Sequence, residues 1–159
     1  MTIQNIIDSY TDKQVLTDEQ ITSILSDLRN ETVKYVRQNK NRSFSIQLLN
    51  QIIAKRKDTD NEIGSIDNIM FSCYLIALCG QLEDSLLVWQ AKKVDFDTYC
   101  GVDIQLTVFA GVSKTVLYLK SLKTGEADEA VTYVQECWEA GDFDEIENYF
   151  SEEEEPYWL

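Results

Sequence analysis

Histidine is absent from this chain of 159 residues, and so is any glycine-rich phosphate-binding motif. Without histidine there is no imidazole general base, no usual zinc ligand and no Ser-His or Cys-His pair. The six glycines are isolated, and none is followed by Lys and then Ser or Thr, as a phosphate-binding loop requires. We therefore expect a protein that is not an enzyme and that carries no cofactor or metal ion.

Long hydrophobic runs and paired cysteines are also lacking. The longest apolar stretch, Ile69 to Gly80, is interrupted by Ser72 and is far shorter than the ~20 residues that cross a bilayer. The first residues lack the basic and apolar regions of a signal peptide. The four cysteines show no Cys-x-x-Cys spacing, which favours reduced, mostly buried thiols, with two disulfides as the alternative in an exported protein. We expect a cytoplasmic protein that does not contact a membrane.

Acidic residues, in contrast, are abundant and gather toward one end. The net charge of −14 divides into +3 for residues 1–57, −4 for 58–94 and −13 for 95–159. Such a field repels nucleic acid and anionic lipid, and it can raise the capture rate of a basic partner by ~10-fold to 1000-fold. Solubility is the simpler explanation of an acidic surface. It accounts for the sign of the charge better than for its segregation.

The last 36 residues combine this charge with aromatic rings: they hold 13 acidic side chains and no Lys or Arg. A disordered solvating tail rarely contains such rings, whereas Tyr and Trp make the strongest contacts at interfaces. Tyr157 and Trp158 follow Pro156, outside any expected helix, so they must either fold back or bind a partner. Residues 152–159 could form a partly mobile tail, and for Glu152 to Glu155 a frayed, solvated helix end is about as good an explanation as a contact role.

We predict a partner-binding surface made of acidic and aromatic residues in this half of the chain. It comprises Asp95, Asp97, Asp103, Asp142, Asp144, Glu145, Glu147, Tyr149, Glu152, Glu153, Glu154, Glu155, Tyr157 and Trp158. The first three aspartates also have part of the spacing of a calcium loop. Tyr99 and Cys100, however, stand where that loop needs a ligand and a glycine, so the match fails.

Apolar spacing and capping residues predict helices along almost the whole chain. Their expected ranges are 3–10 with Thr2 as cap, 17–38 with a capping box at Thr17, 45–57, 65–79 ended by Gly80, 83–93, 98–109 capped by Asp97, 114–122 capped by Ser113, 126–140 ended by Gly141, and 142–151. The alternation of apolar and polar residues over 102–108 leaves a strand as the competitor there.

The fold class expected from these ranges is all-α, as one helical domain over residues 1–159. Helix pairs joined by short glycine turns favour stacked antiparallel pairs of the HEAT type, with an irregular helical bundle as the alternative. Asp95-Phe96-Asp97 recurs as Asp142-Phe143-Asp144 after 47 residues, within the ~40 to 47 of such repeats. The tripeptide can also be a favoured helix start, in which one aspartate caps the backbone and the other meets the helix dipole.

Two segments carry a resemblance to a known family. Residues 89–122, with Asp-Phe-Asp-Thr-Tyr-Cys-Gly-Val-Asp-Ile-Gln and Phe-Ala-Gly-Val-Ser-Lys-Thr-Val-Leu-Tyr-Leu, and residues 140–150 resemble the small acidic helical immunity proteins encoded beside bacterial polymorphic toxins. The resemblance implies a protein that binds and neutralises one cognate toxin domain, often by blocking its active site. A toxin that acts on nucleic acid or a nucleotide would offer a basic cleft to the acidic surface. A helical adaptor or assembly scaffold is the alternative function, and residues 1–60 carry no part of the resemblance.

Overall fold

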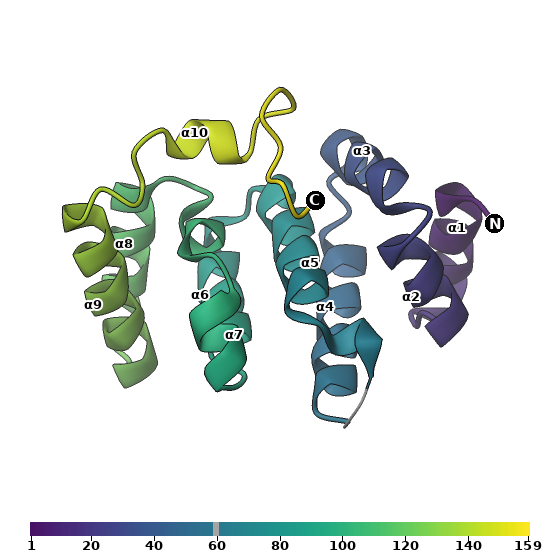
Figure 1. The fold of residues 1–159 in the computed structure, drawn as a ribbon, viewed down its shortest axis with the longest axis horizontal. Helices are drawn as coiled ribbons and strands as arrows, with labels where there is room; N and C mark the ends of the chain where they lie inside the picture. Colours follow the sequence, from purple (N-terminus) through teal and green to yellow (C-terminus); the bar gives the residue numbers. More distant parts are fainter. Residues whose placement is uncertain (59–60) are drawn as a thin grey trace. The chain divides into compact units, whose positions relative to one another are not determined.

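The chain is mostly helical (Figure 1) in the computed structural model, which describes residues 1–58 and 61–159. Its α-helices are α1 (Ile3–Lys13), α2 (Asp18–Leu25), α3 (Arg29–Asn39), α4 (Arg42–Arg56), α5 (Ile66–Cys79), α6 (Ser85–Lys92), α7 (Phe96–Gly101), α8 (Val112–Leu122), α9 (Gly125–Glu139) and α10 (Ile146–Tyr149). Short 3-10 helices are η1 (Glu62–Gly64), η2 (Leu82–Asp84) and η3 (Ile104–Val108). No strand occurs in the described ranges, so the predicted all-α class is confirmed.

The chain divides into two compact units, and the predicted single helical domain over residues 1–159 stays a prediction. Unit 1 comprises Met1–Cys79 together with Trp158–Leu159, and unit 2 comprises Gly80–Tyr157.

Unit 1 is organised around α5, which lies beside α4 (Figure 1). Every residue of α5 from Ile69 to Cys79 is buried, as expected of a helix that is apolar on most sides. The left-handed backbone of Gly80 follows it, with φ of 74°, so the predicted glycine stop is confirmed.

Unit 2 contains α6 to α10, and α8 lies beside α9 (Figure 1). Its core holds one indole, Trp89, among aliphatic side chains of α6, η3, α8 and α9. Phe143 also enters this core, from the turn that follows α9. That ring helps to anchor the acidic segment after α9 to the rest of the unit, and Ile146 packs against the same core.

Capping residues account for several helix starts. Thr17 begins α2 with a capping box, in which its hydroxyl accepts a hydrogen bond from the Gln20 amide and the Gln20 side chain accepts one from the Thr17 amide. Thr2 begins α1 with the same arrangement through Asn5. Both predicted caps are confirmed. Helix α4 starts three residues earlier than the predicted range of 45–57, because the Asn41 side chain caps it by accepting from the Phe44 amide.

The long helix predicted over 17–38 is wrong, because the chain breaks between α2 and α3. The Ser26 hydroxyl donates to the Thr22 carbonyl at 2.8 Å, a side-chain bond that competes with the helical backbone. The backbone of Ser26 then leaves the helical region, with φ of −114° and ψ of −93°. Ile24 before the break and Val33 after it are both buried, so the apolar stripe continues although the helix does not.

The helix predicted over 98–109 is also wrong, and so is the alternative strand. Asp95, not Asp97, caps α7, since its carboxylate accepts from the Thr98 amide at 2.9 Å. The helix ends at Gly101, and the alternating segment forms η3 instead. A further correction concerns α8, which begins directly after Gly111, so Ser113 lies inside its first turn and is not its cap.

The repeated tripeptide does not mark equivalent positions. Asp95-Phe96-Asp97 opens α7 and leaves Phe96 79% exposed, whereas Phe143 of the second copy is buried. The predicted helix over 142–151 is wrong in its first part, because residues 141–145 form turns and only α10 is helical. The arrangement of the helices as HEAT-type repeats stays a prediction.

Candidate functional site

The charge of the molecule resides almost entirely in unit 2. Residues 80–157 contain 18 acidic and 5 basic residues, whereas 1–79 contain 10 acidic and 9 basic residues. Unit 2 therefore carries a net charge of −13. A surface of this sign attracts cations over a range of about 8 Å at physiological ionic strength.

The acidic segment after α9 is tied to η3 and the residue before it by side-chain hydrogen bonds. Tyr149 donates from its hydroxyl to the Asp103 carboxylate at 2.8 Å, and Gln105 donates to the carbonyl of Asp142 at 3.0 Å. These contacts bring Asp103, Asp142 and Tyr149 of the predicted surface together. Four acidic side chains of this segment are exposed, namely Asp142, Asp144, Glu145 and Glu147.

The remaining predicted residues have different environments. Asp95 and Asp97 are exposed at the start of α7, where Asp95 also serves as the helix cap. Glu152, Glu153, Glu154 and Glu155 are exposed, and Tyr157 is 99% exposed.

The prediction that Trp158 belongs to this surface is wrong, because its side chain is buried and cannot anchor a partner there. Its ring meets that of Tyr74 edge to face at 5.9 Å, and its carbonyl accepts from the Arg29 guanidinium at 3.2 Å. Arg29 itself lies over the Phe71 ring at 4.4 Å. Of the two outcomes that the sequence allowed, Trp158 therefore folds back, and it does so within unit 1.

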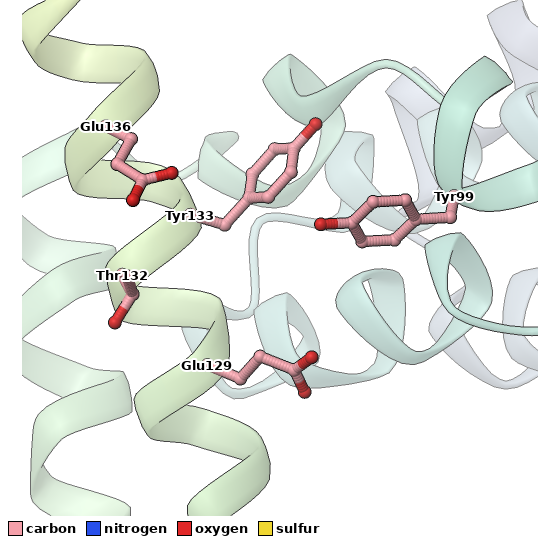
Figure 2. Close-up of a pocket in the computed structure, with 5 residues that line it drawn as sticks. All are labelled: Tyr99, Glu129, Thr132, Tyr133 and Glu136. Carbon is pink, nitrogen blue, oxygen red and sulfur yellow. The ribbon is translucent and has the colours of Figure 1, made fainter. Parts of the chain in front are cut away.

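A pocket of about 230 Å³ opens to solvent between α7 and α9 (Figure 2). Its lining consists of Tyr99 from α7 and of Glu129, Thr132, Tyr133 and Glu136 from α9. The four α9 residues share one face of the helix, because they are spaced at i, i+3, i+4 and i+7. Figure 2 shows the Tyr99 side chain reaching from α7 toward α9.

The two tyrosine rings that line this pocket contact each other and the ring of Trp89. The ring centroids of Tyr99 and Tyr133 are 5.5 Å apart, and their planes are inclined at 74°. Trp89, fully buried, lies 5.5 Å from Tyr133 and 6.5 Å from Tyr99. Rings in contact at these distances stabilise one another beyond the area they bury. The pocket wall is thus held in place by the core of unit 2.

A buried lysine lies against the same rings. Lys92, at the end of α6, is 2% exposed, and its ammonium donates to the carbonyls of Tyr99 at 2.5 Å and Val102 at 2.6 Å. The ammonium lies 5.4 Å from the ring centroid of Tyr99 and 5.3 Å from that of Tyr133. Burial lowers the pKa of Lys92, and the nearby Asp103 carboxylate opposes that shift. Lys92 therefore fixes the end of α7, and with it the backbone of Tyr99.

Two phenol groups and one carboxylate of the pocket lining are available to bind a ligand. Burial raises the pKa of Tyr133, with a smaller contribution from Cys137, so its phenol stays protonated. Within the described ranges, neither phenol oxygen of Tyr99 and Tyr133 is hydrogen-bonded and the Glu136 carboxylate has no partner, whereas Glu129 pairs with Lys93.

Sequence reasoning missed this pocket and two exposed rings of unit 2. Trp138 on α9 is 48% exposed and Phe96 is 79% exposed, yet neither was among the predicted surface residues. The helical spacing of Glu129, Tyr133 and Glu136 was a readable signal. Their meeting with Tyr99 was not, because it depends on the packing of α6, α7 and α9.

Comparison with protein-family models, with curated proteins and with solved structures found no match for this chain. In the ranges that the structure covers, no helix is both long enough and apolar enough to pass through a membrane. Nor do those ranges hold a cluster of three or more His, Cys, Asp or Glu side chains suited to a metal ion.

The thiols near the pocket should differ in reactivity. Cys100 is exposed, whereas burial, followed by the Asp142 carboxylate, raises the pKa of Cys137 to about 11. Because the thiolate is the reacting species, roughly a thousandth of Cys137 is reactive at pH 8. We expect N-ethylmaleimide to label Cys100 first, and labelling of Cys137 to speed up about tenfold per pH unit up to its pKa. Peptide mass spectrometry on wild type and Cys100→Ser measures both rates; equal rates at pH 8 would contradict the assignment.

Proposed function

We propose that this protein binds a basic protein domain through the acidic surface of unit 2. The observation that supports this most directly is the charge segregation, with 18 acidic against 5 basic residues in 80–157 and near balance elsewhere. Nucleic acid and anionic lipid are repelled by such a surface, whereas a cationic protein is drawn to it. Exposed rings within the same unit, among them Phe96 and Trp138, supply apolar contacts that slow dissociation.

We further propose that the partner is a toxin domain, neutralised in the cytoplasm of the cell that produces both proteins. This finer proposal is supported by the resemblance of residues 89–122 and 140–150 to immunity proteins, and both segments belong to unit 2. Charge complementarity provides the mechanism, because an acidic surface can occupy a basic cleft that otherwise holds phosphate groups.

Co-expression with the product of the neighbouring gene tests the toxin proposal. Rescue of growth and a tight one-to-one complex would support it. Self-association of the protein, or binding of several unrelated partners without rescue, would favour an adaptor or scaffold instead.

Charge reversal tests the surface itself. We expect the fourfold variant Asp142→Lys, Asp144→Lys, Glu145→Lys and Glu147→Lys to weaken binding of the partner by roughly 10-fold to 100-fold, since each exposed contact contributes up to about 1 kcal/mol. The slope of affinity against salt concentration should also become flatter. Isothermal titration calorimetry at several salt concentrations measures both quantities.

The matched control reverses four exposed acidic residues of unit 1, namely Asp8, Asp12, Glu19 and Asp27. Both variants change the net charge equally. If the segment 142–147 makes local contacts, only the first variant should lose affinity strongly. Equal losses would mean that the net charge of the protein determines affinity and that segment 142–147 makes no local contacts. Unchanged affinity in the first variant would argue against this surface.

A further inference from the structure

We propose that the pocket between α7 and α9 receives the side chain of one arginine of the basic partner. The pocket is defined by Tyr99, Glu129, Thr132, Tyr133 and Glu136 (Figure 2). This inference rests on the proposed function, because it names one chemical group that the partner must present.

The size of the pocket favours a side chain over a larger ligand. Its volume of about 230 Å³ lies below the ~300 to 1,000 Å³ of pockets that enclose whole small molecules. It is open on one side, so its occupant can enter while remaining attached to a larger body. A protein side chain that projects from a surface has this shape.

The charge of the lining selects a cation, and Glu136 supplies the attraction. The negative charge of Glu129 is largely neutralised by Lys93, with which it forms an ion pair. Lys92 places a second positive charge against the Tyr133 ring. Glu136 is exposed and has no hydrogen-bond or ion-pair partner in the described parts of the chain. An incoming cation therefore finds one uncompensated carboxylate at the pocket wall.

The geometry of the rings and hydroxyls selects arginine among cations. A guanidinium is planar and weakly hydrated, so it stacks on an aromatic face at small cost, and its five N–H donors can reach several acceptors together. The phenol oxygens of Tyr99 and Tyr133 can accept hydrogen bonds, Glu136 lines the same pocket, and the two rings stand almost perpendicular, at 74°. An ammonium is a compact, strongly hydrated charge that would have to give up water to use the same ring face.

Nuclear magnetic resonance of full-length protein with ring-labelled tyrosines tests the pocket with a single-charge probe. We expect N-acetyl-arginine amide to shift the resonances of Tyr99 and Tyr133 saturably, with a dissociation constant in the millimolar range. Tyr157, at 99% exposure, should not shift. N-acetyl-lysine amide should bind at least about threefold more weakly. Absence of saturable shifts, or equal binding of both probes, would overturn the proposal.

A conservative variant and its neighbour sharpen the test. Glu136→Gln should weaken the arginine probe by about fivefold, as expected for one exposed ionic hydrogen bond. Glu139→Gln is the control, because Glu139 is exposed on the same helix, one turn away, and does not line the pocket. If the two variants weaken binding of the arginine probe equally, the probe responds only to the net charge of the protein, and the pocket assignment is overturned.

Deca-arginine and deca-lysine peptides separate this inference from the proposed function. Reversal of the four acidic residues in 142–147 should weaken the binding of both peptides if the surface of unit 2 binds basic partners, whereas Glu136→Gln should weaken the binding of deca-arginine more strongly than that of deca-lysine. If reversal changes neither peptide while Glu136→Gln still weakens deca-arginine, the pocket stands and the proposed surface fails. If reversal weakens both and Glu136→Gln changes neither, the surface stands and the arginine pocket is overturned.

Discussion

Replacing Lys92 by alanine is expected to lower the free energy of unfolding of unit 2 by about 4 kcal/mol. The substitution removes two hydrogen bonds from a charged donor, to the carbonyls of Tyr99 and Val102, and leaves both acceptors without that donor. It also removes an aliphatic stem that is buried with the residue, at about 0.8 kcal/mol for each methylene. Hydrogen exchange on peptides that cover α6 to η3 measures the loss.

The variant Lys92→Met separates the charge from the packing. Methionine restores an unbranched side chain but supplies no donor to the two carbonyls, so the expected loss is about 2 kcal/mol. The cost is smaller than the full strength of two ionic hydrogen bonds, because methionine also avoids the desolvation of a buried ammonium. The difference between the two variants therefore reports the packing of the lysine stem.

The adjacent lysine is the control. Lys93 pairs with Glu129, and the two side chains are 31% and 53% exposed, so this is a surface ion pair. Lys93→Met should cost no more than about 1 kcal/mol. Should Lys92→Ala prove as mild as Lys93→Met, Lys92 would not be the residue that holds the end of α7.

Lys92 also illustrates what the sequence alone could not provide. A lysine at the end of a helix is expected to point into solvent and complement the helix dipole. Its burial depends on the last turn of α7 and the turn that follows, which present the carbonyls of Tyr99 and Val102 beside the end of α6. That turn was predicted as a continuous helix, so the acceptors were not foreseen.

Local signals, in contrast, were sufficient for the helical class and for several helix ends. Thr17 with Gln20 and the glycine after α5 act through atoms within four residues, so a sequence pattern is enough to identify them. The break at Ser26 lies at the limit of such reasoning, because serine inside a helix only sometimes diverts the backbone.

The candidate site was predictable in charge but not in shape. The four acidic side chains of 142–147 are exposed, whereas Trp158 is not, because Tyr74 and Arg29 of unit 1 offer it a ring and a donor. No sequence pattern relates residue 158 to residues so distant along the chain. The same is true of Tyr99 and α9, whose contact forms the pocket.

Replacing Gly64 by alanine is expected to destabilise unit 1 by about 3 kcal/mol. Gly64 is buried in η1, which packs against α4. A Cβ atom at this position would lie 2.4 Å from the Cα of Arg56 and 2.5 Å from its backbone nitrogen. These are backbone atoms of a regular helix, so no side-chain rotation can relieve the overlap, and η1 must move away from α4.

That movement would also break a hydrogen bond, because the Arg56 guanidinium donates to the Gly64 carbonyl at 2.9 Å. Gly125→Ala is the matched control: Gly125 begins α9, and an added Cβ would have no neighbour within 4 Å. There alanine should be neutral or stabilising by up to about 1 kcal/mol, since it favours the helix and restricts the unfolded chain. Urea unfolding of both variants, monitored by hydrogen exchange in each unit, should show a loss of stability for Gly64→Ala and no loss for Gly125→Ala. A Gly64→Ala variant as stable as wild type would mean that η1 does not pack this closely on α4.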